Sequence, residues 1–186
     1  MVLSKLIEEL TGAIVSSIKG ADDILSALRS AVKNQVVGAL KDSGDVATTG
    51  MDSLGNVVQG GINAASKVGT SLVDASKSTV SAAVSGVSEV GGDVLVAARK
   101  AAGAAVTAVA GVGGDVGSAA VSAVEGSIEA ASKVGTSTTD AAKEAVIGVV
   151  KAADEAGGET GKSVRDALMA AASLPHDVVE KAVKGS

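Results

Sequence analysis

The sequence predicts an all-α protein made of long amphipathic helices with an eleven-residue, or hendecad, repeat. When the chain is written in rows of eleven from Leu3, one column contains no polar residue. A second, largely apolar column lies four residues later, so the two columns are neighbours on a helix. Eleven residues make three turns at about 3.67 residues per turn, a spacing that a strand with a period of two cannot produce.

The composition favours a rod over a conventional globule. The 186 residues include no Phe, Tyr or Trp, although 46% of them are apolar. Aromatic rings normally supply much of the bulk of a core, so burial here must come from many small side chains in long, regular contact. We therefore expect an extended rod or a helical hairpin that packs laterally in an oligomer.

The chain divides into four expected parts. Residues 1–43 form an N-terminal amphipathic helix, and 44–61 form a glycine-containing hinge. Residues 62–173 form one long hendecad region with a candidate turn at 111–114, and 174–186 form a short C-terminal helix. The eleven-residue register passes through every candidate break without an insertion or deletion, which favours long, nearly straight helices.

A glycine occupies the apolar column on every second repeat. Inside a helix each glycine costs about 0.5–1 kcal/mol relative to alanine, so the series should have a compensating use. Valines stand in the same column eleven residues away, and a neighbour shifted by eleven residues could place valine side chains in the glycine gaps. The predicted helix-packing residues are therefore Gly69, Gly91, Gly113, Gly135, Gly157, Val58, Val80, Val124 and Val146.

The charged residues indicate a solvated face and exclude some partners. Both signs are interspersed on the arc opposite the apolar stripe, and the net charge is −5. A nucleic-acid partner is not expected, because it would require a basic face. The chain has no cysteine and therefore no disulfide or thiolate site. We expect no cofactor, no metal site and no enzymatic activity.

One stretch matches a motif that carries chemistry. Residues 156–163, Ala-Gly-Gly-Glu-Thr-Gly-Lys-Ser, fit a relaxed phosphate-loop pattern in which Ala replaces the first Gly. Lys162 and Ser163 stand where a phosphate-binding lysine and a magnesium-binding hydroxyl would lie. The motif requires a buried strand directly before the loop, whereas the preceding residues are polar and helical in period. Nucleotide binding is therefore only the third functional hypothesis.

The other candidate residues are not expected to converge. His176 is the only histidine, so neither Ser-His-Asp catalysis nor a multi-histidine metal site is expected. Asp93 and Asp115 share a face but would stand about 33 Å apart on a continuous helix. Met51 and Met169 are expected to fill the core.

Neither a secretory signal nor a transmembrane helix is evident. Glu8 and Glu9 interrupt the first apolar run. The uncharged run from Ala101 to Gly114 is shorter than the roughly 18 to 20 residues that a bilayer span requires. A cytoplasmic location is the default expectation.

The eleven-residue repeats and their Val-Gly-Gly segments resemble those of synucleins, perilipins and exchangeable apolipoproteins, between about Val58 and Gly161. The resemblance is one of period and composition. It implies reversible binding of amphipathic helices to a phospholipid or oil interface, and it assigns no role to an individual residue.

Two functions follow from the apolar stripe. The first is a structural protein that assembles with copies of itself into a bundle, filament or sheath, because small side chains permit many close helix contacts. The alternative is a coat on a lipid, membrane or granule surface that binds through the same stripe.

Overall fold

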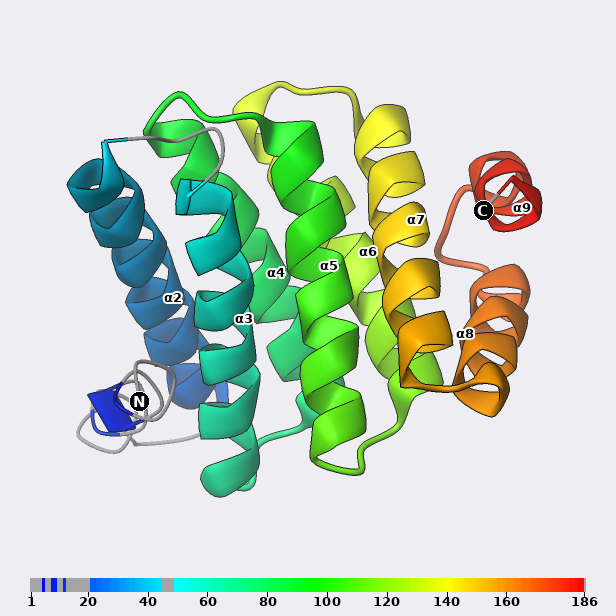
Figure 1. The fold of residues 1–186 in the computed structure, drawn as a ribbon, viewed down its shortest axis with the longest axis horizontal. Coiled ribbons are helices and arrows are strands. Elements are labelled where there is room, and N and C mark those ends of the chain that lie inside the picture. Colours follow the sequence, from blue (N-terminus) through cyan, green and yellow to red (C-terminus); the bar gives the residue numbers. More distant parts are fainter. Residues whose placement is uncertain (1–4, 6–7, 10–11, 13–20, 45–48, 186) are drawn as a thin grey trace.

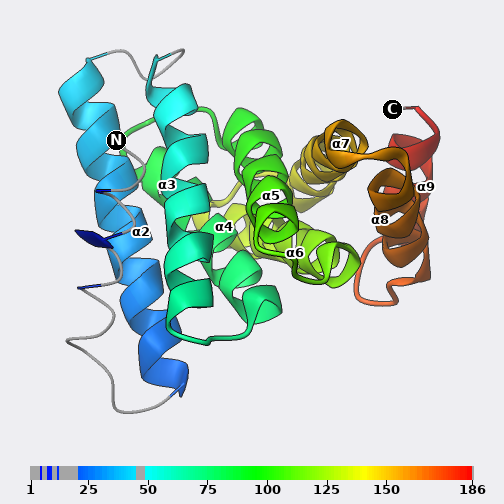
Figure 2. The same ribbon diagram turned by 60° about the horizontal axis from the view of Figure 1, so that its bottom comes forward.

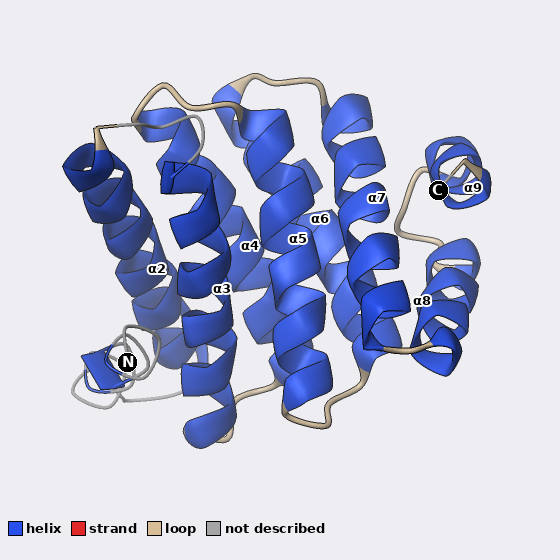
Figure 3. Ribbon diagram, viewed as in Figure 1, coloured by secondary structure: helices blue, strands red, loops and turns tan. Residues whose placement is uncertain are grey.

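The computed structural model describes residues 21–44 and 49–185, together with residues 5, 8, 9 and 12. Within these residues every regular element is a helix, which confirms the predicted all-α class (Figure 3). The helices are α2 (Ala21–Ser43), α3 (Thr49–Lys67), α4 (Leu72–Glu89), α5 (Val94–Gly111), α6 (Val116–Val134), α7 (Thr138–Ala156), α8 (Gly158–Ala170) and α9 (His176–Lys184).

Consecutive helices from α2 to α7 run in opposite directions and alternate between two layers (Figures 1 and 2). The even layer contains α2, α4, α6 and α8, and the odd layer contains α3, α5 and α7. Helix α9 lies against α7 and α8 at the C-terminal end. Each central helix therefore lies beside the helix two positions along the chain and faces its sequence neighbours in the other layer.

The expected long helix is wrong. The range 62–173 contains the end of α3 and all of α4 to α8, so it is folded back on itself several times. The turn expected at 111–114 is present between α5 and α6, but comparable turns separate the other helices as well. The rod or single hairpin is replaced by a stack of short helices.

The other three expected segments, 1–43, 44–61 and 174–186, agree only in part with the helices of the structure. The hinge expected at 44–61 lies mostly inside α3, which begins at Thr49. Of the N-terminal helix expected over 1–43, the structure describes α2, which ends at Ser43 as expected. Most of residues 1–20 lie outside the described residues. The short helix expected within 174–186 is α9.

The twenty-two-residue glycine series marks the ends of helices. Four of these glycines, Gly69, Gly91, Gly113 and Gly135, have φ values of 74°, 76°, 73° and 74°. Glycine adopts this left-handed conformation without the steric cost that a Cβ brings. The residue after each glycine donates its N–H to a carbonyl five residues earlier, as from Gly92 to Val87 at 2.9 Å, which is the Schellman pattern. The fifth glycine, Gly157, has φ 149° and separates α7 from α8.

Helix starts keep the same spacing as the glycines. The side chains of four N-cap residues accept backbone N–H groups from the first turn of α4, α5, α6 and α7: Ser71, Asp93, Asp115 and Ser137. One repeat is thus one helix plus one turn. Because twenty-two residues equal six helical turns at about 3.67 residues per turn, the register continues across every such turn.

The predicted valine-in-glycine contact is therefore also wrong. A Cβ placed on Gly69, Gly91, Gly113 or Gly135 would have no atom within 4 Å. The valines predicted with these glycines do lie in the core, where each is 0% exposed: Val58, Val80, Val124 and Val146. The apolar column alternates between a mid-helix core residue and a turn.

Different glycines make the close contacts between helices. A Cβ on Gly126 of α6 would lie 2.5 Å from the carbonyl oxygen of Lys77 in α4. Gly148 of α7 lies similarly close to the backbone of Arg99 in α5, and a Cβ on Gly103 would lie 3.0 Å from the Gly148 oxygen. Small residues thus allow backbone approach within each layer.

The apolar stripe is covered by the chain itself. The core runs through both layers and consists mainly of Ala and Val, with larger side chains such as Leu28, Ile62 and Leu168. Among the large apolar side chains of the described residues, Val96 and Val112 are the exposed ones, at 39% and 38%. The stripe therefore needs neither a second copy nor lipid to be buried.

Candidate functional site

The phosphate-loop match lies in a helical context. Residues 156–163 span the end of α7 and the first turns of α8, and the segment before them is helix α7. Lys162 and Ser163 are exposed on α8. The N–H of Gly161 donates to the Gly157 oxygen at 2.9 Å as part of the helix start. No strand leads into this segment, so the backbone cradle that the motif requires is not formed.

The other candidate residues belong to different helices and have different structural roles. His176 is exposed at the start of α9, and Asp93 and Asp115 cap different helices. Met51 is buried in α3 and Met169 is half-buried in α8, in agreement with the core role predicted for them. No group of three or more His, Cys, Asp or Glu side chains that could hold a metal ion occurs in the described part of the chain.

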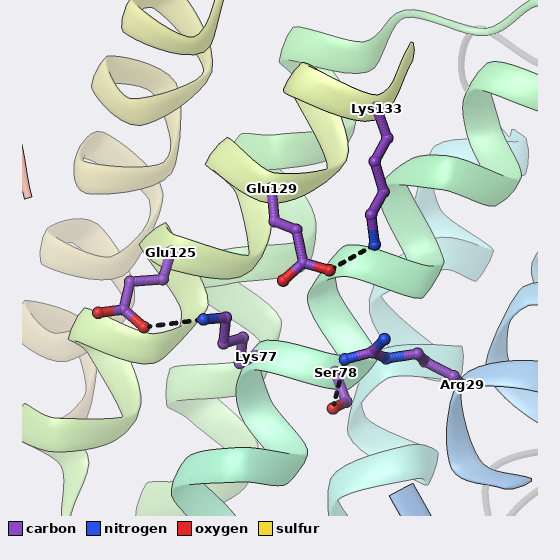
Figure 4. Close-up of polar contacts among 6 residues, drawn as sticks. All are labelled: Arg29, Lys77, Ser78, Glu125, Glu129 and Lys133. Atoms are coloured by element: carbon purple, nitrogen blue, oxygen red, sulfur yellow. Dashed lines mark hydrogen bonds and ion pairs between the residues drawn. The ribbon is translucent and has the colours of Figure 1, made fainter. Parts of the chain in front are cut away.

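Charged side chains link the helices of the even layer (Figure 4). Arg29 of α2 donates to the hydroxyl of Ser78 in α4 at 3.5 Å, and Lys77 of α4 pairs with Glu125 of α6 at 3.4 Å. Glu129 pairs with Lys133 one turn further along α6. The Lys133 hydrogen bond holds the pKa of Glu129 below its ordinary value, and the charges of Arg29 and Lys77 add to the effect.

A groove of about 550 Å³ lies beside α6 at this point. Its charged side chains are the ones already paired with each other, so a ligand would have to compete with internal ion pairs. It holds no histidine or thiol and no arrangement of a nucleophile with a base. The lining residues are Lys77, Glu125, Ile128, Glu129, Ser132, Lys133, Thr138 and Ser173.

Ion pairs also join the helices of the odd layer. Arg99 of α5 pairs with Glu144 of α7, and Lys100 pairs with Asp52 of α3 at 2.9 Å. These cations lie near the start of α5. The sequence contains no signal that would have matched these partners, because each pair joins helices more than forty residues apart in the chain.

The outer face of α5 beyond these pairs carries no charge. It consists of Thr107, Ala110 and Gly111, which are half-buried or exposed, and it ends at the exposed Val112. We call these four residues the α5 face. Helices α3 and α7, which lie on either side of α5, carry half-buried or exposed polar and charged side chains, such as Gln59 and Lys151. The α5 face is thus an uncharged strip in the middle of the odd layer.

Helix α5 is also the one described helix that is long and apolar enough to cross a membrane, with a mean hydropathy of 1.4 over 18 residues. In the fold, 56% of that window is buried, because α5 lies between α3 and α7 and against α4 and α6. A central helix of a bundle meets the same criteria of length and composition.

Comparisons with known proteins assign no family. The chain matches no protein-family model and no curated protein.

Proposed function

We propose that this chain is a non-enzymatic structural protein, a rigid stack of helices that associates with copies of itself. Two features support the proposal. The candidate reactive groups do not converge among the described residues, and the uniform helix-turn unit gives a stiff scaffold in which each helix contacts its near neighbours. The association surface cannot be the apolar stripe of the folded chain, because the stripe is already buried.

The α5 face is the surface that we propose for self-association. It is the observation on which the proposal depends: a strip of small, uncharged residues between flanks that carry charges, in a chain with a net charge of −5. Two such strips can approach closely without burying an ion, so little desolvation opposes the contact. Because the chain has no aromatic anchor, we expect weak association that depends on concentration.

A pair of charge insertions tests this surface. In the full chain, Thr107→Lys with Gly111→Glu places two charges one helical turn apart on the α5 face. The matched control, Ser30→Lys with Asn34→Glu, places the same charges on exposed positions of α2 in the opposite layer. Light scattering over a hundredfold concentration range measures the mass.

We expect the mass of the wild type and of the control to rise from 17.7 kDa toward twice that value. The mass of the α5-face variant should stay at the monomer value. A wild type that is monomeric throughout, or an α5-face variant that associates like the wild type, would contradict the proposal.

The alternative, a coat on lipid or granule surfaces, requires the two layers to separate so that the stripe becomes accessible. If the coat hypothesis is right, the fold must change when the protein meets a lipid surface. Addition of anionic phospholipid vesicles to the wild type would then broaden the amide signals of the core residues and raise the protease sensitivity of the turns. Unchanged spectra and cleavage patterns would argue against the coat.

A further inference from the structure

The outer surface of the odd layer, on the side away from the even layer, carries two exposed charges next to the α5 face. Helices α3, α5 and α7 lie side by side in this layer and run in the same direction (Figure 1). Lys151 and Glu155 stand one turn apart on α7 and make no ion pair within the described residues. Glu144, on the same side of α7, pairs with Arg99, so this side borders α5. We call Lys151 and Glu155 the α7 pair.

Helix α3, on the other side of α5, carries a longer row of polar side chains. Asp52, Asn56, Asn63 and Lys67 follow one another at spacings of four, seven and four residues, so they lie along one side of the helix. Asn63 is half-buried and the other three are exposed. Asp52 pairs with Lys100 at 2.9 Å, so this side of α3 also borders α5. We call these four residues of α3 the α3 row.

The α7 pair and the α3 row are centred at the same height along the helix axes. The midpoint of the α7 pair is residue 153, and the midpoint of the α3 row lies between residues 59 and 60. Because the helices are parallel, side chains that bond across the layer mark equal heights: Lys100 meets Asp52, 48 residues away, and Arg99 meets Glu144, 45 residues away. Both midpoints therefore lie beside residues 107 and 108 of α5, at Thr107 of the α5 face.

A two-fold axis that crosses the three helices at this height would bring unlike charges together. It places each helix of the layer against the same helix of a second copy, in antiparallel orientation, so that residues equally far from the axis meet. The residues that would then face each other are Lys151 with Glu155, Asp52 with Lys67, and Asn56 with Asn63. A carboxamide both donates and accepts hydrogen bonds, so two of them can pair. The surface is thus complementary to itself in this one orientation.

The other two-fold arrangement, with the axis along α5, does not match the charges. It would set α3 of one copy against α7 of the other in parallel orientation. At the heights given above, Lys151 would lie opposite Gln59, and Glu155 opposite Asn63. Two charges from each copy would then lose water against neutral amides, a cost that the antiparallel contact reduces by pairing them.

We propose that the α5 face binds a second copy of this chain in antiparallel orientation, and that the α7 pair and the α3 row select this orientation. The orientation rests on the proposed self-association through the α5 face. The small residues of α5 supply the close contact, whereas the exposed charges add little affinity and decide which arrangement forms. A contact of like surfaces about a two-fold axis closes on itself, so it gives a dimer and not a filament.

Charge reversal at the α7 pair tests the orientation in the full chain. Lys151→Glu sets a glutamate against the partner's Glu155 twice in each dimer, and Glu155→Lys sets two lysines against each other in the same way. The controls, Lys162→Glu and Asp166→Lys, make the same changes in net charge at exposed positions of α8 in the even layer. Sedimentation equilibrium measures the dissociation constant, and circular dichroism measures the helicity.

We expect each α7 variant alone to dissociate at least about tenfold more readily than the wild type, because like charges meet. The two controls should associate like the wild type. An equimolar mixture of Lys151→Glu and Glu155→Lys should recover the wild-type dissociation constant, because both glutamates of one copy then meet both lysines of the other. In the parallel arrangement neither the weakening nor the recovery is expected.

Association of the α7 variants at the level of their controls, or a mixture as weak as the single variants, overturns the antiparallel orientation. If a reversal on α7 lowers the helicity, Lys67→Glu takes its place, since it sets a glutamate against the partner's Asp52. That variant must also weaken the association, and wild-type behaviour overturns the inference.

The two proposals fail in different ways. A wild type that is monomeric at every concentration contradicts both the α5 face and the orientation built on it. A wild type that dimerises, is blocked by Thr107→Lys with Gly111→Glu, and is indifferent to charge reversal on α7 contradicts the orientation alone.

Discussion

At the scale of single residues, glycine has two unrelated uses in this chain. Gly91 and Gly113 supply a left-handed backbone at helix ends, whereas Gly126 and Gly148 allow two helix backbones to approach. Both uses favour glycine, so the residue type alone does not distinguish them. The regular series was predicted to make the close contact because it lies in the apolar column. Gly126 and Gly148, which do make it, are also twenty-two residues apart, but they belong to another column, in which the preceding repeats have Ala82 and Ala104.

The role of these glycines in turns predicts that an added methyl group destabilises the fold through backbone strain, even where there is space for it. Gly113→Ala should lower the free energy of unfolding by about 1–2 kcal/mol, because alanine is strained at φ 73° although no atom lies within 4 Å. Gly111→Ala, two residues earlier in the helix and equally open, should raise it by up to about 1 kcal/mol. Urea unfolding measures both, and equal effects of the two changes would refute the turn role.

The contact role predicts a cost of steric origin. Gly126→Ala should destabilise the fold by about 1–3 kcal/mol, because its Cβ would meet the Lys77 oxygen at 2.5 Å and one helix must move. Gly55→Ala is the control, since its nearest neighbour would be 3.9 Å away and alanine is the better helix former. If Gly126→Ala is as stable as Gly55→Ala in thermal unfolding, the close contact between α4 and α6 is wrong.

At the scale of helices, the unbroken eleven-residue register led to the wrong prediction of one long helix. A turn was expected to disturb the eleven-residue register, and an undisturbed register was interpreted as a continuous helix. Here a helix and its turn together span two repeats of eleven, so a turn such as Val90 to Asp93 preserves the phase. The signals that do mark the turns are glycine followed two residues later by Ser or Asp, as at Gly113 and Asp115. Capping chemistry, rather than periodicity, would have separated the helices.

The caps predict how stability depends on pH. The N–H and hydroxyl of Ser118 donate to Asp115 at 3.0 and 2.7 Å, and these bonds lower the pKa of Asp115 below its ordinary 3.8. Because the folded-state pKa is the lower one, the ionised cap contributes its full stability above pH 3.8 and loses it as the pH falls through the folded-state value. Asp115→Asn keeps a capping oxygen but removes the charge.

We therefore expect Asp115→Asn to be less stable than the wild type by about 0.5 kcal/mol at pH 7, where the carboxylate also interacts with the dipole of α6. The difference should shrink as the pH falls well below 3.8. Asp166→Asn, an exposed aspartate of α8 that caps no helix, serves as the control. A difference for Asp115→Asn that is the same at pH 7 and in strong acid would contradict this role of the cap.

At the scale of the whole molecule, the sequence predicted the kind of contact but not its partner. The all-helical class, the amphipathic faces, the core valines and the short last helix could be predicted from periodicity and from Pro175. The layers could not, because a stripe of small residues fits another part of the same chain as well as another molecule. The cross-helix pairs such as Lys77 with Glu125 depend on that arrangement and were missed with it.

The two-layer stack requires the stripe to be buried inside one folded chain, and small-angle X-ray scattering tests this directly. At a concentration where light scattering gives 17.7 kDa, a compact stack of this length should have a radius of gyration of about 16 Å. A continuous helix would be about 280 Å long with a radius of gyration of roughly 80 Å, and a single hairpin of half that length, about 140 Å, would give roughly 40 Å. We predict a value close to 16 Å. A monomer at about 25 Å or above would contradict the two-layer stack.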